Sequence, residues 1–231
     1  MIDWHSHVLP GIDDGSRSIE ESLELLRMLS EQGAETVVMT PHFLANTESV
    51  ESFIERRELS FEKLRSSLSG NEPELVTGAE VKYYSGISRM PELKKLTIGE
   101  SGLLLLEMPM SKWTEYTVRE LIELSGSVGV TLVLAHIDRY MKLQNGDIWE
   151  RLYEREILMQ VNASFFTEFA TRRKALAMLG AGKINFIGSD CHGVTSRPPK
   201  IGKAFEIIAK KMGDNFVSQI NEYGKSMLTN I

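Results

Sequence analysis

Short apolar segments alternate with longer amphipathic ones along the chain, and this alternation constrains the fold more than any other feature. A run of aliphatic and β-branched residues is typical of a buried strand, whereas apolar residues recurring every three or four positions predict a helix. Strands that alternate with helices form a parallel sheet, because each helix returns the chain to the start of the next strand. We expect seven strands, in the opening segment that contains His5 and at residues 36–40, 74–81, 102–107, 131–135, 157–162 and 185–188.

Helix signals occupy the intervals between these strands. Ser18 and Glu21 have the spacing of a capping box that begins the first helix, which ends before Gly33. Residues 82–100 are interrupted by glycines and a proline and predict a loop with a short helix, and the chain after Gly224 is expected to fray. Further helices are expected at 48–68, at 114–128, for about two turns from Asp147, from Ser164 to residue 179, from Pro198-Pro199 to Met212, and from Asp214.

Length and composition favour a single domain over residues 1–231, because 231 residues with 42% hydrophobic composition can bury one large core. The formal charge of -6 gives no general attraction for nucleic acid or for an anionic membrane. One cysteine excludes an internal disulfide, and we find no signal-peptide pattern and no apolar run long enough to span a bilayer. We therefore expect a cytoplasmic protein that binds no nucleic acid and inserts into no membrane.

All five histidines follow expected strands, and none lies in an expected helix. In closed α/β barrels, functional groups collect at the carboxyl ends of the strands, so these histidines are expected to converge in space. His5 and His7 point the same way if the opening segment is a strand, because side chains alternate between its two faces. Pro10-Gly11 then turns the chain so that Asp13 or Asp14 can return toward the same point, and this spacing does not decide between the two.

Carboxylates follow other expected strands in the same way, which raises the number of converging metal ligands to nine. Any one of them alone is more simply a helix-capping residue or a buried core histidine, so the prediction depends on the whole set. A single zinc ion takes about four ligands, so the set suits two or three ions of manganese, iron or zinc, with carboxylates bridging. Asn162 could also reach this point, but it is interpreted as a loop residue outside this set. The nine are His5, His7, Asp14, His42, Glu80, Glu107, His136, Asp190 and His192.

With these positions identified, the sequence resembles the polymerase-and-histidinol-phosphatase (PHP) superfamily over nearly its whole length. Within it, the chain is similar to the bacterial manganese-dependent tyrosine-protein phosphatases of capsule and exopolysaccharide operons. Two positions depart from the family pattern, Phe43, where a further histidine is common, and Cys191, where a small residue is common. The resemblance is carried by His5-Ser6-His7-x-x-Pro10-Gly11-x-Asp13-Asp14-Gly15, Thr40-Pro41-His42, Gly78-x-Glu80, Leu106-Glu107-x-Pro109, Ala135-His136-x-x-Arg139, and Gly188-Ser189-Asp190-x-His192 with Arg197.

This resemblance implies a distorted TIM-like barrel of seven β/α units, a three-metal centre, and Arg139 and Arg197 as the groups that hold the substrate phosphate. A metal-bridging hydroxide would attack phosphorus in line with the departing oxygen. The implied partner is the tyrosine-rich tail of a bacterial tyrosine kinase that controls polysaccharide synthesis, and a homo-oligomer is left open. One ion would be bound by His5, His7, Glu80 and Asp190, a second by Glu80, Glu107 and His136, and a third by Asp14, His42 and His192.

Four other interpretations are weighed against this one. Cys191 and Arg197 have the C-x5-R spacing of cysteine-dependent tyrosine phosphatases, but Asp190 should raise the pKa of the thiol, and Pro198-Pro199 follows where a helix should begin. A phosphomonoesterase for a small molecule, such as histidinol phosphate, would use the same ligands. A non-catalytic metal-binding interaction module would use them without turnover, whereas a nuclease is disfavoured by the acidic charge.

Overall fold

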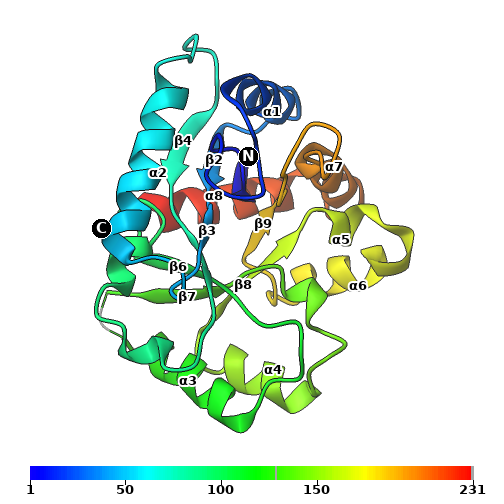
Figure 1. Cartoon of the computed structure of the whole chain (residues 1–231). Coiled ribbons are helices and arrows are strands. Elements are labelled where there is room, and N and C mark those ends of the chain that lie inside the picture. Colours follow the sequence, from blue (N-terminus) through cyan, green and yellow to red (C-terminus); the bar gives the residue numbers. More distant parts are fainter. Residues whose placement is uncertain (128, 230–231) are drawn as a thin grey trace.

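The computed structural model describes residues 1–127 and 129–229 and shows an α/β fold around a curled parallel sheet (Figure 1). Each of the seven expected strand segments is extended. The strands are β1 (Ile2–Ser6), β2 (Thr36–Met39), β3 (His42–Phe43), β4 (Glu74–Thr77), β5 (Glu80–Lys82), β6 (Leu103–Glu107), β7 (Thr131–Leu134), β8 (Leu158–Asn162) and β9 (Phe186–Gly188).

Within the described residues the strands form a three-stranded sheet, β1-β2-β4, and a six-stranded sheet, β3-β5-β6-β7-β8-β9. Every strand pair is parallel, as the alternation of strands and helices predicts. The two sheets meet where Ser6, at the end of β1, forms a parallel bridge with Cys191, which follows β9. The sheet therefore curls until its first and last strands lie side by side.

One expected strand is followed by an additional short strand, and another is broken. β2 lies within the strand expected at residues 36–40, and β3 begins after Pro41, which has no N–H to donate to a neighbouring strand. The strand expected at residues 74–81 divides into β4 and β5 at Gly78. The neighbours stay in register across the breaks, since the Gly78 N–H donates to Met39 O (2.9 Å) and the Glu80 N–H donates to Pro41 O (3.0 Å).

Helices lie on the outer side of the sheet, between successive strands (Figure 1). The expected short helix in residues 82–100 is present as two 3-10 turns, and the helix end expected at Val128 lies outside the described residues. The helices are α1 (Ile19–Glu31), α2 (Val50–Arg65), α3 (Glu115–Ser125), α4 (Gly146–Tyr153), α5 (Ser164–Thr167), α6 (Phe169–Gly180), α7 (Ile201–Met212) and α8 (Asp214–Thr229), with 3-10 turns η1 (Ile87–Arg89), η2 (Leu93–Leu96) and η3 (Ile137–Arg139).

The single helix expected from Ser164 is wrong, because extended backbone at Glu168 divides it into α5 and α6. A break of this kind leaves carbonyl groups without helical donors. Thr171 Oγ1 donates to Phe165 O (2.8 Å), and the Arg172 guanidinium donates to Phe166 O (3.0 Å) and Thr167 O (2.9 Å). These side chains satisfy the exposed carbonyls, so the break costs little.

The expectation that the chain frays after Gly224 is also wrong, since α8 continues to Thr229. Gly224 lies against β1, where a Cβ atom would come within 3.3 Å of side-chain atoms of Ile2 and Trp4. Met227 and Leu228 pack on the same apolar cluster of the sheet. Tertiary packing therefore stabilises the end of the helix. Within the described residues, no helix is both long and apolar enough to cross a bilayer.

Candidate metal centre

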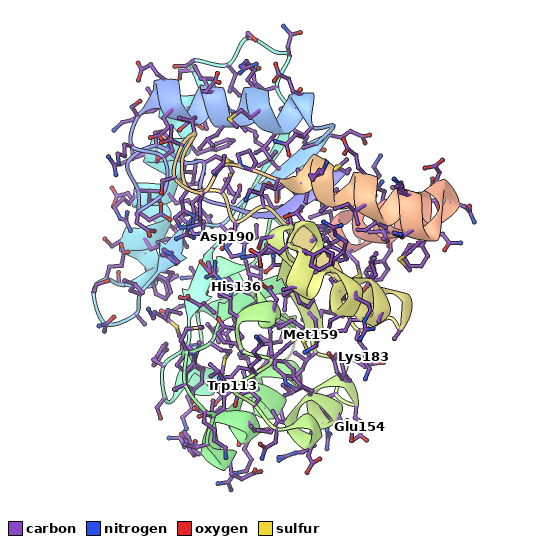
Figure 2. All side chains as sticks on the ribbon, turned by 90° about the vertical axis from the view of Figure 1, so that its right-hand side faces the viewer. Trp113, His136, Glu154, Met159, Lys183 and Asp190 are labelled. Carbon is purple, nitrogen blue, oxygen red and sulfur yellow. The ribbon has the colours of Figure 1, made fainter. Side chains whose placement is uncertain are left out.

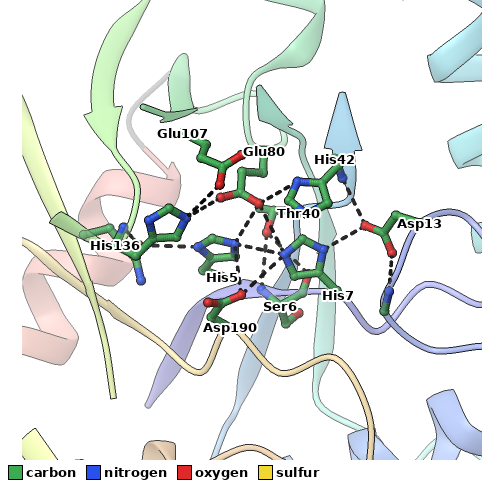
Figure 3. Close-up of polar contacts among 12 residues, drawn as sticks. His5, Ser6, His7, Asp13, Thr40, His42, Glu80, Glu107, His136 and Asp190 are labelled. Carbon is green, nitrogen blue, oxygen red and sulfur yellow. Dashed lines mark hydrogen bonds and ion pairs between the residues drawn. The ribbon is translucent and has the colours of Figure 1, made fainter. Parts of the chain in front are cut away.

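The first strand delivers two imidazoles to the carboxyl end of the sheet. His5 lies within β1 and His7 just after it, both are buried, and their Nε2 atoms are 3.1 Å apart (Figure 3). The Nδ1 atom of His7 is 2.8 Å from Asp13 Oδ2. Because an ionised carboxylate can only accept, Nδ1 carries the proton, and the Nε2 lone pair of His7 points into the space between the two rings.

The structure separates the roles of the two neighbouring aspartates. Asp13 turns away from this space, because its carboxylate also accepts from the N–H groups of His42 (3.0 Å) and Gly15 (2.9 Å). Asp14 Oδ1 instead lies 3.3 Å from His42 Nε2 and 3.5 Å from His192 Nε2. Asp14 is therefore the aspartate that joins the histidines, and Asp13 orients one of them.

Glu80, at the start of β5, lies at the centre of the cluster (Figure 3). Its side chain is 1% exposed, and its two oxygens face four imidazoles from three segments of the chain. Glu80 Oε1 is 2.7 Å from His136 Nε2, which in turn is 3.8 Å from Glu107 Oε1. Glu80 Oε2 is 2.9 Å from His42 Nδ1 and 3.4 Å from the Nε2 atoms of both His5 and His7.

Asp190 closes the opposite side and connects the histidines to two arginines. Its Oδ1 atom is 3.8 Å from His5 Nε2 and 3.6 Å from His7 Nε2. Its Oδ2 atom pairs with the guanidinium of Arg139, and Arg197 Nη1 lies 3.2 Å from Oδ1. Figure 2 shows Asp190 and His136 close together in the middle of the molecule, with Glu154 and Lys183 toward its edge.

All nine expected ligands therefore meet at one place. Three groups have donor atoms that all lie within 4.8 Å of one another, close enough to share a cation. His136 belongs to none of these groups, but its contact with Glu80 places it beside the third. The groups are His7, Asp14, His42 and His192, then His5, His7 and Asp190, then His42, Glu80 and Glu107.

Two buried nitrogens in this cluster, His42 Nδ1 and His192 Nε2, form no well-aligned hydrogen bond within the described part of the chain, although carboxylate oxygens of Glu80 (2.9 Å) and Asp14 (3.5 Å) lie close to them. Leaving a buried polar atom unpaired costs about 1–3 kcal/mol. A divalent cation between the imidazoles and carboxylates would supply the missing partner, and nitrogen and oxygen donors are those that manganese, iron and zinc accept. The residues present therefore fit a cluster of metal ions.

The charges of the cluster keep its carboxylates ionised. Burial raises the pKa of Asp190, but the imidazole of His5 and the guanidinium of Arg139 outweigh it and lower that pKa to about 2. Burial also opposes ionisation of Glu80, yet His5, His136 and His42 hold its pKa well below the usual range. The site consequently offers negative oxygens to cations at neutral pH.

Backbone strain is concentrated at the same place. Of the four non-glycine residues with positive φ in the described chain, three belong to the site, namely His136 (31°), Asp190 (51°) and Arg197 (58°). The left-handed region is unfavourable for residues that carry a Cβ atom, and such conformations persist where the surrounding structure enforces them. The fold therefore uses backbone strain to aim two ligands and one arginine at a common point.

Two amides on β8 belong to the site, although neither is among the predicted ligands. Asn162 is not a loop residue but the last residue of β8, and its Nδ2 donates to Asp190 Oδ2 (2.8 Å). Gln160 Oε1 faces the Nδ1 atom of His5 (3.4 Å) and accepts from the His136 N–H. The sequence contained a signal for these two amides. Residues 160 and 162 are two positions apart in an expected strand, so their side chains lie on the same face of it, although the strand supplies no ligand itself. β8 positions the ligands of its neighbours.

Replacing Asn162 with Ala is expected to weaken metal affinity by about 10–100-fold, the usual effect of losing a group that orients a metal ligand. The Asp190 carboxylate would lose one of its two donors to Oδ2, keep the one from Arg139, and rotate more freely. Titration with manganese, followed by calorimetry, measures the change. Asn185→Ala removes an amide that accepts from Met159 N at the other end of β8 and is the matched control. Equal affinities of the two variants would contradict a positioning role for Asn162.

Cys191 is not placed to act as a nucleophile. Its side chain is fully buried, and burial, with the nearby carboxylates of Asp3 and Asp190, raises the pKa of the thiol well above its usual range. A catalytic cysteine requires the opposite environment, exposed and electropositive. The C-x5-R spacing that Cys191 forms with Arg197 therefore has no catalytic meaning here.

Cys191→Ser is accordingly expected to retain hydrolysis of an aryl phosphate within about threefold of the parent protein, because the thiolate takes no part in the reaction. Initial rates with added manganese measure this, and thermal unfolding controls for packing damage at a buried site. Two results together would contradict the metal site. These are loss of activity in a folded Cys191→Ser variant and parent activity that chelators leave unaffected.

Comparisons with known proteins agree with this architecture. The chain is 32% identical over 230 residues to tyrosine-protein phosphatase CpsB of Streptococcus pneumoniae, covering 92% of this chain and 91% of that protein. It is 25% identical over 235 residues to tyrosine-protein phosphatase YwqE of Bacillus subtilis, covering 100% and 92%. Crystal structures of YwqE and CpsB, described as metal-dependent tyrosine phosphatases, include a chain with the same fold (TM-score 0.83, 23% identity, covering 100% of this chain and 95% of that one). The family model for capsular polysaccharide synthesis, CpsB/CapC, matches residues 1–228, and the chain belongs to that family.

Proposed function

We propose that this protein is a metal-dependent protein-tyrosine phosphatase. The observation that carries the proposal is the convergence of nine imidazoles and carboxylates on one point, with two arginines paired to one of those carboxylates. Metal ions flanked by guanidinium groups are the typical equipment for hydrolysing a phosphate ester. The names of the CpsB and YwqE relatives support the choice of tyrosine phosphate over other esters.

Imidazole nitrogens and carboxylate oxygens would hold the ions, since the only thiol of the chain is buried in packing beside the cluster. This donor set favours manganese, with iron or zinc as alternatives. When bound, the ions activate the attacking water and neutralise charge on the phosphate. In the proposed assignment, His5, His7, Glu80 and Asp190 bind one ion, Glu80, Glu107 and His136 a second, and Asp14, His42 and His192 a third.

Arg139 and Arg197 bind the phosphate oxygens of the substrate. Their side chains are 32% and 49% exposed, so they border solvent while their guanidinium groups reach the buried Asp190. A guanidinium fork matches the geometry of a phosphate and stabilises the charge that builds on its oxygens in the transition state. A tyrosine phenolate, with a pKa near 10, departs without much help from an acid, and this suits a site that offers few acids.

The proposal is tested by hydrolysis of phosphotyrosine with added manganese. Chelation is expected to abolish turnover and manganese to restore it, because the buried ligands have no catalytic group of their own to replace the ions. An alkyl phosphate is expected to react at least about tenfold more slowly, since its leaving alkoxide is a much stronger base than a phenolate. Equal turnover of the two esters would instead favour a small-molecule phosphomonoesterase, and absence of turnover would favour a non-catalytic metal-binding module.

The proposed physiological substrate is the phosphotyrosine-containing tail of a bacterial tyrosine kinase that controls capsular or exopolysaccharide synthesis, and the proposed compartment is the cytoplasm. Membership of the CpsB/CapC family supports this assignment. We also propose that the two sheets form one distorted barrel of seven β/α units, with β2 and β3 as one broken strand and β4 and β5 as another. The Ser6–Cys191 bridge between the first and last strands supports closure.

A further inference from the structure

A pocket of roughly 360 Å³ opens directly beside the metal-binding cluster. It lies between the segment after β7, the start of α5, and the connection from β9 to α7. Arg139, Asp190 and Arg197 belong to both the pocket and the cluster. A phosphate held by the two arginines therefore lies at the boundary between the ligands and this pocket.

The walls of the pocket combine apolar and polar surface. Phe165, which is 5% exposed, and Pro198 supply the apolar part, while Asn162, Ser164 and Thr171 supply hydroxyl and amide groups. A phenyl ring has an apolar face, and rings of this kind are commonly held against aromatic and proline side chains in clefts of this size. An aliphatic serine or threonine ester would leave these walls uncovered.

A second pocket, of roughly 650 Å³, lies on another side of the site. Its lining has a net negative charge, which disfavours a phosphorylated ligand. Its lining includes the carboxylates of Glu48, Glu51 and Glu92 against the single cation of Lys82. Neither Arg139 nor Arg197 lines it. Like charges repel, so a phosphate dianion and the chain attached to it are directed away from this pocket and toward the arginines.

From this contrast we infer that the pocket bounded by Phe165 and Pro198 receives the aryl ring of the phosphotyrosyl substrate. The inference rests on the proposed function and adds to it the place where tyrosine is distinguished from serine and threonine. The arginines hold the phosphate, and the pocket holds the ring.

A bulky group attached at Ser164 after folding tests the assignment. The Ser164 hydroxyl makes no hydrogen bond within the described residues, so Ser164→Cys should fold normally. The new thiol adds across the double bond of N-benzylmaleimide, forming a carbon–sulfur bond while its proton moves to the neighbouring carbon. Cys191 is fully buried and stays unlabelled, which the parent protein treated with the same reagent verifies. Asn46→Cys, in the acidic pocket, is the matched control.

Labelling Ser164→Cys is expected to raise KM for a phosphotyrosyl peptide about 10–100-fold, the usual effect of losing a side-chain subsite. The inhibition constant of inorganic phosphate, which has no ring, is expected to stay within about twofold, and the Asn46→Cys adduct should leave both constants unchanged. A rise in KM with the Asn46→Cys adduct alone, no effect of the Ser164→Cys adduct, or an equal rise in KM and in the phosphate inhibition constant would each overturn the ring assignment. If the unlabelled parent hydrolyses no phosphotyrosine, the proposed function fails first.

Discussion

Glu80→Gln is expected to lower kcat/KM for aryl phosphate hydrolysis by at least about a thousandfold. Glu80 is 1% exposed, and its two oxygens contact imidazoles from β1, β3 and the segment after β7. Glu80 thereby contacts four of the other proposed ligands, His5, His7, His42 and His136. In the proposed assignment Glu80 is a ligand of two ions, so a neutral amide of the same shape would weaken the binding of both.

Metal content and kinetics together make this prediction specific. We expect Glu80→Gln to retain less manganese per chain than the parent protein after gel filtration, as measured by atomic emission. Glu74→Gln is the matched control, because Glu74 lies in β4 of the same broken strand and is exposed to solvent. A folded Glu80→Gln variant that keeps full metal content and activity within tenfold of the Glu74→Gln variant would rule out a bridging role.

Arg139→Ala is expected to lower kcat/KM by about 100–1,000-fold, the cost of removing one donor that stabilises transition-state charge. Arg139→Lys should recover only part of this loss, because an ammonium group cannot present two parallel N–H donors to a phosphate. The inhibition constant of inorganic phosphate should rise in both variants. The metal content per chain should stay close to that of the parent protein, since Asn162 and Arg197 still hydrogen-bond to Asp190.

The control for this prediction is Arg155→Ala. Arg155 is an exposed arginine that lines a pocket in contact with β7 and β8 and away from the ligands. It should leave the phosphate inhibition constant unchanged. If Arg139→Ala keeps kcat/KM within threefold of Arg155→Ala, phosphate is held by other groups. If the Arg139→Ala variant loses metal in proportion to its loss of activity, Arg139 acts by orienting Asp190 and not by binding substrate.

Much of the architecture was predictable because its signals are local. The apolar segments 102–107, 131–135 and 157–162 were expected as strands, and β6, β7 and β8 lie within those ranges. Parallel strands bring their carboxyl ends to one edge whatever lies between them, so residues just after the strands were expected to meet. His42 and His136 meet at Glu80 for this reason, although 94 positions along the chain separate them.

The predictions that were wrong all concern features that depend on contacts made by side chains and not on local sequence patterns. The helix break at Glu168 depends on the side chains of Thr171 and Arg172, which donate hydrogen bonds to the carbonyls left unpaired by the break. Apolar periodicity and capping patterns in the sequence do not predict such contacts. The order of α8 after Gly224 depends on β1, at the other end of the chain. The role of Asn162 depends on Asp190, a neighbour only because β8 and β9 pair.

The sequence by itself determined that this protein is a parallel α/β fold with imidazoles and carboxylates at the strand ends, because periodicity and position are properties of the chain. Only the tertiary structure decided which groups share a point. It turned Asp13 toward His7 and Asp14 toward His42, and it paired both arginines with Asp190. Such choices depend on distances of a few ångströms between distant segments, which are set only when the sheet curls and its strand ends meet.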